Sequence, residues 1–113
     1  MYDYQASLES VTDGDTVRYL IDMGMFIRSA HALRLLNVHA PELSELGGKE
    51  AKAFVGQWHA EHASNVSRWP YRIFTEKDKQ TFNRYIGIVT CTTCGECLND
   101  DINAYLTPKE PTL

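Results

Sequence analysis

The chain has 113 residues, of which 43% are hydrophobic and 23% are charged, and its formal net charge at pH 7 is -4. This length suits one domain with a single hydrophobic core. The acidic balance argues against a protein that coats nucleic acid by general electrostatics, because such domains are usually basic. Action on phosphates remains open where positive charge is local or a metal ion supplies it.

Three further features bear on location. No apolar run approaches the length of a membrane span, so we expect no membrane partner. The first residues, MYDYQASLES, have neither the basic nor the apolar region of a secretory signal. Three cysteines, an odd number, favour reduced thiols. We therefore expect a cytoplasmic protein.

Three strands are predicted in the first third of the chain. Residues 2–11 form the first, which leads into an Asp-Gly turn at 13–14. Residues 16–24 alternate, so that Val17, Tyr19 and Ile21 share one face. Gly24 marks the next turn, and residues 25–38 predict a long, bent third strand.

A helix, two strands and a shorter helix follow. Apolar residues recur at helical spacing over 48–64, which predicts the first helix. Residues 71–78 and 84–93 predict two strands, and residues 98–106 predict a short helix before a frayed tail at 107–113. Five strands with a helix between the third and fourth favour an α+β, mainly β fold, a five-stranded Greek-key barrel of the OB type that forms one domain over 1–113. The side chains predicted to be buried in it include Val17, Leu35, Val38, Phe54, Trp58 and Ile86.

Four segments, in this order, carry a family resemblance: VTDGDTV, LRLLNVHAPE, GKEAKAF and NRYIGIV. Together they resemble the staphylococcal nuclease-like family, also called thermonuclease-like, over roughly residues 5–106. The resemblance implies an OB-fold barrel with a metal-dependent phosphodiesterase site that cuts DNA and RNA and leaves a 3′-phosphate. In the family this site uses calcium, two arginines and a glutamate.

Residue by residue, the resemblance implies catalytic roles for Arg34, Glu42 and Arg84. Arginine suits phosphate chemistry because its planar fork donates two hydrogen bonds and keeps its charge. Glu42 would activate or orient the attacking water. Asp15 matches the family's direct metal ligand, and Asp13 matches an acidic neighbour of that ligand.

The chain departs from the family at three places. His39 stands where the family usually has a metal-binding aspartate, QTFNR at 80–84 lacks a loop carboxylate and a glycine, and the chain stops soon after its second predicted helix. Calcium takes oxygen ligands, whereas imidazole suits transition metals. Three alternatives follow for the site: no metal, manganese or another transition metal, or calcium held by Asp15, a backbone carbonyl and water.

Other candidate residues lie outside these motifs. The locally basic stretch 72–84 supplies the predicted nucleic-acid contacts, which are Arg72, Lys77 and Lys79. The CTTCGEC segment holds half of a zinc site, and free thiols in a hairpin are the favoured interpretation of Cys91, Cys94 and Cys97. His59 and His62, three apart on the predicted helix, are expected on its solvated face.

The favoured function is a metal-dependent endonuclease acting on DNA, RNA or both. One alternative is a nucleic-acid-binding OB-fold module that has lost catalysis, which His39 and the altered 80–84 loop favour. Another is a protein-interaction domain, which the acidic balance favours. The sequence does not indicate the oligomeric state.

Overall fold

The structure, a computed structural model, describes residues 2–63, 68–77 and 85–106. Its elements, in chain order, are β1 (Tyr2–Val11), β2 (Thr16–Asp22), β3 (Arg28–Leu35), α1 (Gly48–Glu61), β4 (Tyr71–Lys77), β5 (Tyr85–Cys91) and α2 (Leu98–Leu106). The predicted order of five strands and two helices is confirmed. The third strand is shorter than predicted, because a turn precedes Arg28 and another follows Leu35.

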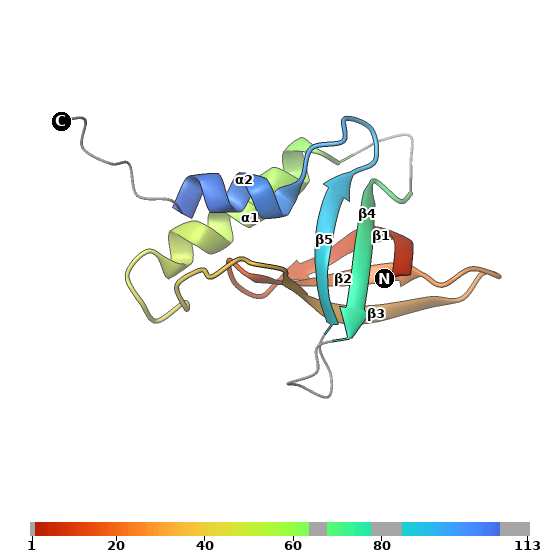
Figure 1. Cartoon of the computed structure of the whole chain (residues 1–113), viewed down its shortest axis with the longest axis horizontal. Helices are drawn as coiled ribbons and strands as arrows, with labels where there is room; N and C mark the ends of the chain where they lie inside the picture. The colour runs from red at the N-terminus through yellow and green to blue at the C-terminus, as the bar shows by residue number, and fades with distance from the viewer. Residues whose placement is uncertain (1, 64–67, 78–84, 107–113) are drawn as a thin grey trace.

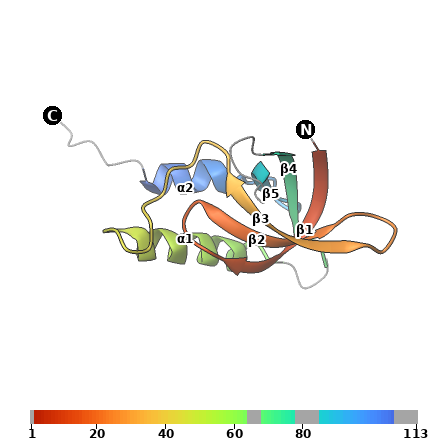
Figure 2. The same cartoon turned by 90° about the horizontal axis from the view of Figure 1, so that it is seen from below.

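The five strands close into a barrel in the order β1-β2-β3-β5-β4 (Figures 1 and 2). All neighbouring pairs are antiparallel except β3 with β5, and β4 returns to pair with β1. The two helices lie against each other on one side of the barrel. This arrangement confirms the predicted α+β, mainly β architecture and is that of an OB-type barrel.

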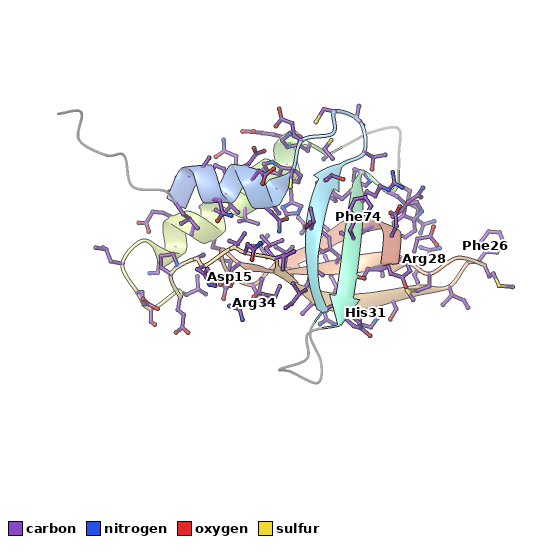
Figure 3. The ribbon with its side chains drawn as sticks, viewed as in Figure 1. Asp15, Phe26, Arg28, His31, Arg34 and Phe74 are labelled. Carbon is purple, nitrogen blue, oxygen red and sulfur yellow. The ribbon has the colours of Figure 1, made fainter. Side chains whose placement is uncertain are left out.

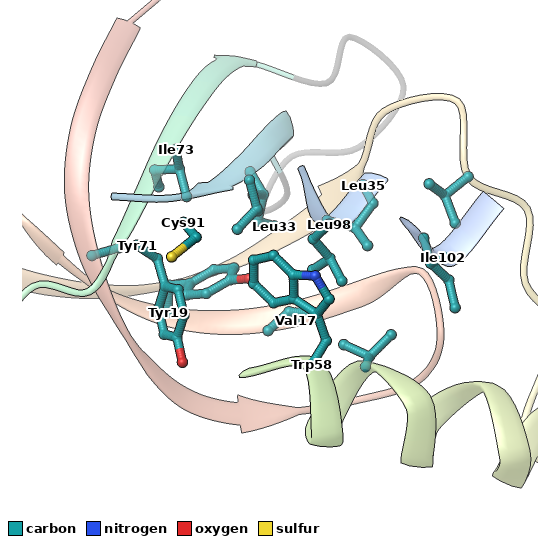
Figure 4. Packing of buried hydrophobic residues seen from close by; sticks show 14 of the residues in the cluster. Val17, Tyr19, Leu33, Leu35, Trp58, Tyr71, Ile73, Cys91, Leu98 and Ile102 are labelled. Carbon is teal, nitrogen blue, oxygen red and sulfur yellow. The ribbon is translucent and has the colours of Figure 1, made fainter. Parts of the chain in front are cut away.

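The core forms where the inward faces of the strands meet the two helices (Figure 4). Val17, Tyr19 and Ile21 of β2 are all buried, as their alternation predicts. The prediction of burial is also confirmed for Leu35, Val38 and Trp58.

The prediction of burial is wrong for Phe54 and Ile86, which are half-buried. On β5 the inward positions are Gly87, Val89 and Cys91, so Ile86 belongs to the outward-facing set. Phe54 stacks on Tyr105 of α2, with ring centroids 4.6 Å apart, at the edge of the helix pair rather than inside the barrel.

Asn99 fixes α2 to the barrel. Its amide group donates to the carbonyls of Leu36 and Gly87, at 3.0 and 3.1 Å, and its side-chain oxygen accepts from the amide of Val89 at 3.0 Å. All these partners belong to β5 or to the residue that follows β3. The buried side chain therefore ties together the parallel strands near the end of β3 that carries Arg34.

Within the described ranges, no helix is long and apolar enough to span a membrane.

Candidate functional site

The turn between β1 and β2 brings Asp13 and Asp15 together. The amides of Thr12 and Asp13 both donate to the carbonyl of Thr16, at 3.1 and 3.2 Å. The amide of Asp15 donates to Oδ1 of Asp13 at 3.1 Å, so the first carboxylate closes the turn that presents the second.

Gly14 allows this turn to sit against the rest of the site. A Cβ atom at this buried position would lie 2.6 Å from Cβ of Ala40 and 2.7 Å from Cβ of Ala51. Only glycine fits at this position, because a Cβ atom would make contacts shorter than those found between real Cβ atoms. The turn therefore packs directly between α1 and the corner at 39–42.

Arg34 lies beside Asp15 at the matching end of the neighbouring strand. Thr16 of β2 is paired with Arg34 of β3, and the amide of Leu35 donates to the carbonyl of Asp15 at 2.8 Å. Figure 3 shows the labelled Asp15 and Arg34 side by side. Both side chains are half-buried. A carboxylate and a guanidinium from distant parts of the sequence thus occupy one surface.

The Asp15 carboxyl is electrostatically crowded. Partial burial and the nearby Asp13 carboxyl raise its pKa to about 6, while the hydroxyl of Thr16, 3.2 Å away, and the charge of Arg34 act in the opposite direction. A pair of close carboxylates favours either a proton or a bound cation. The Asp13–Asp15 turn is therefore a chemically suitable place for a hard metal ion.

The corner at 39–42 presents His39 and Glu42 to solvent. Both side chains are exposed, whereas Val38 just before them is buried and anchors the segment. The amide of Glu45 donates to the carbonyl of Glu42 at 2.9 Å, and a Cβ on Gly48 would lie 1.8 Å from that same carbonyl oxygen. The start of α1 therefore holds the backbone of Glu42 in place while its carboxylate stays accessible.

The carboxylates of Asp13 and Asp15 suit a metal ion that keeps part of its water shell better than one enclosed entirely by protein ligands. Among the described residues, no group of three or more His, Cys, Asp and Glu side chains is arranged to hold a metal ion. Magnesium sites usually use one or two carboxylates and complete their shells with water and substrate phosphate oxygens, and calcium sites also accept backbone carbonyls and water among their oxygen ligands. Asp13 and Asp15 would suit this mode, with His39 and Glu42 on the adjacent corner.

The remaining predicted site residues have different positions. Arg84 and Lys79 lie outside the described residues, as does the side chain of Lys77. The first described residue after Arg84 is Tyr85, which pairs with Leu33 next to Arg34. Arg72 is exposed on β4, where its Nε donates to Oδ1 of Asp3 at 2.7 Å. Its charge is therefore already compensated by a carboxylate on β1.

The cysteines occupy the end of β5 and the turn after it. All three are free: Cys91 is buried, Cys97 is half-buried and Cys94 is exposed. The amide of Gly95 donates to the carbonyl of Cys91 at 2.9 Å, which closes the turn. The segment leads from β5 into α2 through one isolated bridge between Thr90 and Cys97, and the free-thiol interpretation stays a prediction.

The expectation of a solvated face for both histidines is wrong. His59 is 1% exposed, and its Nε2 and Nδ1 lie 2.6 Å from the Tyr19 hydroxyl and 2.7 Å from the Val55 carbonyl. The hydroxyl of Tyr71 donates to the carbonyl of His59. His62 is half-buried and stacks on Trp58, with ring centroids 4.2 Å apart. His59 follows Val55 by four residues, a spacing that places it on the apolar face and that could have indicated its burial.

Comparison with protein-family models found no match for this chain, and comparison with curated protein sequences found none either.

Proposed function

We propose that this protein is a metal-dependent endonuclease of the staphylococcal nuclease-like type, which hydrolyses phosphodiester bonds of DNA, RNA or both. The observation that carries the proposal is the placement of Arg34 beside the Asp13–Asp15 turn on paired strands of an OB-type barrel. The four sequence motifs described above support the same assignment. They fall on this turn, on β3 and the corner, on α1 and at the start of β5.

The chemistry of the site suits phosphate hydrolysis. Negative charge develops on the phosphate oxygens in the transition state, and the Arg34 guanidinium can donate two hydrogen bonds to them. Donors of this kind contribute about 3 to 4 kcal/mol each in comparable sites. The carboxylates of Asp13 and Asp15 would hold a hydrated cation, which supplies further positive charge beside the phosphate. The exposed Glu42 carboxylate is the proposed acceptor of a proton from the attacking water.

The ligands at the proposed site suit two classes of metal ion. Calcium follows from the family resemblance and from the carboxylate oxygens of Asp13 and Asp15. Manganese or another transition metal follows if the imidazole of His39 takes part. The two cases predict different metal dependence of the same cleavage reaction.

A second candidate is a nucleic-acid-binding module without catalysis. It is favoured by the exposed His39 in place of a carboxylate and by the absence, within the described residues, of three clustered metal ligands. This module would use Arg34 for phosphate binding alone. It would bind nucleic acid equally well with and without divalent metal.

The proposal is tested by incubating the protein with end-labelled single-stranded DNA and RNA in calcium, manganese, magnesium, zinc or EDTA. We expect cleavage with at least one metal, none in EDTA, and loss of cleavage in Asp15→Asn. The matched control is Asp100→Asn, an exposed aspartate in the first turn of α2, which should cleave normally. Binding without cleavage under every metal condition would favour the second candidate. Neither binding nor cleavage at low salt would contradict both.

A further inference from the structure

The hairpin between β2 and β3 projects away from the barrel and carries apolar side chains at its tip. Residues 23–27 join the two strands, and Figure 3 shows Phe26 at the far end of this projection. Met25 and Phe26 are 91% and 101% exposed, and Ile27 is 59% exposed. Solvent contact of this extent is unfavourable for large apolar side chains. The tip therefore requires an explanation outside the folding of the barrel.

The backbone of the tip strengthens this argument. The amide of Ile27 donates to the carbonyl of Gly24 at 2.9 Å, and the two central residues of this turn, Met25 and Phe26, have φ values of 54° and 63°. Positive φ at both central positions defines a type I′ turn, which favours Asn-Gly. A bulky residue in this conformation costs about 1 to 3 kcal/mol. The turn itself thus selects against the side chains that occupy it.

A groove of about 370 Å³ lies between the hairpin tip and residues 68–69. Two aromatic residues, Phe26 and Trp69, and two exposed arginines, Arg28 and Arg68, are among those that line it. The guanidinium of Arg68 lies over the Trp69 ring, 5.8 Å from its centroid. Among the described residues of the lining, Asp22 alone carries a carboxylate, which accepts a hydrogen bond from the amide of Gly24 at 2.9 Å.

We propose that this groove binds a nucleotide of single-stranded nucleic acid, with the base stacked on the exposed ring of Phe26 and the adjoining phosphates held by Arg28 and Arg68. Base stacking on exposed aromatic rings beside arginines is the general mode of single-strand binding on OB-type folds. The inference builds on the proposed function, since it assigns a substrate class to the same protein. A lipid surface fits less well, because two arginines and Asp22 lie inside the groove rather than behind an apolar face.

The ribbon of β2 and β3 connects this groove to the proposed catalytic site. The Thr16–Arg34 pair lies at one end of these two strands and the Asp22–Arg28 pair at the other, and the two pairs are six positions apart along each strand. This separation corresponds to about 20 Å at the usual rise of a strand. A strand with bases stacked at about 3.4 Å would cover it with about six nucleotides. Substrates shorter than about six nucleotides should therefore gain no affinity from the groove.

The test measures binding separately from cleavage. Wild-type protein in EDTA is titrated into a fluorescein-labelled oligothymidylate of about 12 nucleotides, within the site sizes known for single-strand binders, and fluorescence anisotropy is recorded. We expect Phe26→Gly to weaken binding about tenfold, the scale of one lost stacking contact. The matched control Leu46→Gly removes a side chain that is 99% exposed outside the groove, and it should bind as wild type does.

Thermal unfolding of the same variants distinguishes a binding role of Phe26 from a structural role, because a structural role would lower Tm together with binding. Phe26→Gly should raise Tm, because glycine suits the positive φ of the turn, while it weakens binding. A fall in both Tm and oligonucleotide affinity in Phe26→Gly would overturn the proposal. Equal binding by Phe26→Gly and wild type would also overturn it, as would binding to phosphatidylglycerol vesicles with none to the oligonucleotide.

Cleavage assays with metal separate this proposal from the proposed function. Binding that depends on Phe26, with no cleavage under any metal, would support the groove and contradict the nuclease. Cleavage of the long oligonucleotide with the same KM in wild type and Phe26→Gly would support the nuclease and overturn the groove. The nuclease with a working groove predicts a raised KM in Phe26→Gly for the long substrate and no change for one of about four nucleotides.

Discussion

The hydroxyl of Tyr19 lies 2.6 Å from Nε2 of His59 in the interior of the barrel. Nδ1 of the same ring lies 2.7 Å from the carbonyl of Val55, which can only accept, so Nδ1 carries the proton and Nε2 accepts from Tyr19. The bond joins β2 to α1 and satisfies two buried polar groups. It also aligns the strand that begins beside Asp15 with the helix against which Gly14 packs.

Replacing Tyr19 by phenylalanine should destabilise the protein by about 1 to 3 kcal/mol, because Nε2 of His59 is left buried without its donor. The measurement is urea unfolding at pH 7. Tyr105→Phe is the matched control, since Tyr105 is 47% exposed and its change should have little effect. Equal stability of both variants would show that the buried hydrogen bond contributes nothing measurable.

Stability should depend on pH through His59. Burial lowers the pKa of this histidine from 6.5 to about 4, so between these values the unfolded chain binds a proton that the folded chain does not. The stabilising contribution is therefore present above pH 6.5 and is lost as pH falls toward 4, by about 3 kcal/mol in total. Comparing the pH dependence of unfolding in wild type and His59→Gln isolates it. Parallel curves for the two proteins would contradict the prediction.

Asp15→Asn should stabilise the protein at pH 7 while it abolishes cleavage. The pKa of Asp15 is raised from 3.8 to about 6, so the folded state holds its carboxylate unfavourably above pH 6 and gains stability as pH falls toward 3.8. Removing the charge should contribute about 1 kcal/mol at pH 7 once solvent screening is allowed for. Urea unfolding at pH 7 and pH 3.5 checks this, and the gain should disappear at the lower pH. A loss of stability at pH 7 would assign Asp15 to the turn alone.

His39→Asp should strengthen calcium-dependent cleavage, because it replaces a nitrogen ligand by a hard oxygen beside the Asp13–Asp15 turn. His39 is exposed, so the change should leave thermal stability nearly unaltered. The measurement is the cleavage rate as a function of calcium and manganese concentration. His31→Asp, on β3 but in a different environment, is the control. Unchanged metal dependence in His39→Asp would exclude residue 39 from the metal site.

Local patterns predicted the barrel well because its strands alternate and its turns contain glycine or aspartate. The faces of β2 and the bounds of α2 follow directly from residue spacing. The spacing from Val55 indicates which helix face carries His59, but its hydrogen bond could not be predicted from local patterns, because the partner, Tyr19, lies 40 positions earlier in the chain. A polar side chain on an apolar helix face becomes stable only when such a distant partner exists.

In the candidate site, too, some features follow from local sequence patterns and others depend on contacts between distant parts of the chain. The motifs predicted that Asp15 and Arg34 belong to one site, and the β2–β3 register places them side by side. The crowding that raises the pKa of Asp15 depends on the closed Asp13 turn and on partial burial, which are tertiary properties. The compensation of Arg72 by Asp3 likewise arises only when β4 returns to pair with β1.

The single-turnover cleavage rate of Arg34→Ala with saturating metal decides whether Arg34 serves phosphate chemistry beside Asp15. The control is Arg18→Ala, which removes an exposed arginine on the adjacent strand whose Nε lies 3.1 Å from Glu9. We expect the cleavage rate of Arg34→Ala to fall by roughly 100-fold or more, the scale of one transition-state donor, with little change in Tm. Arg18→Ala should cleave at the wild-type rate. Equal rates in the two variants, or unfolding of Arg34→Ala, would exclude a role of Arg34 in phosphate chemistry and assign it to the structure of the barrel.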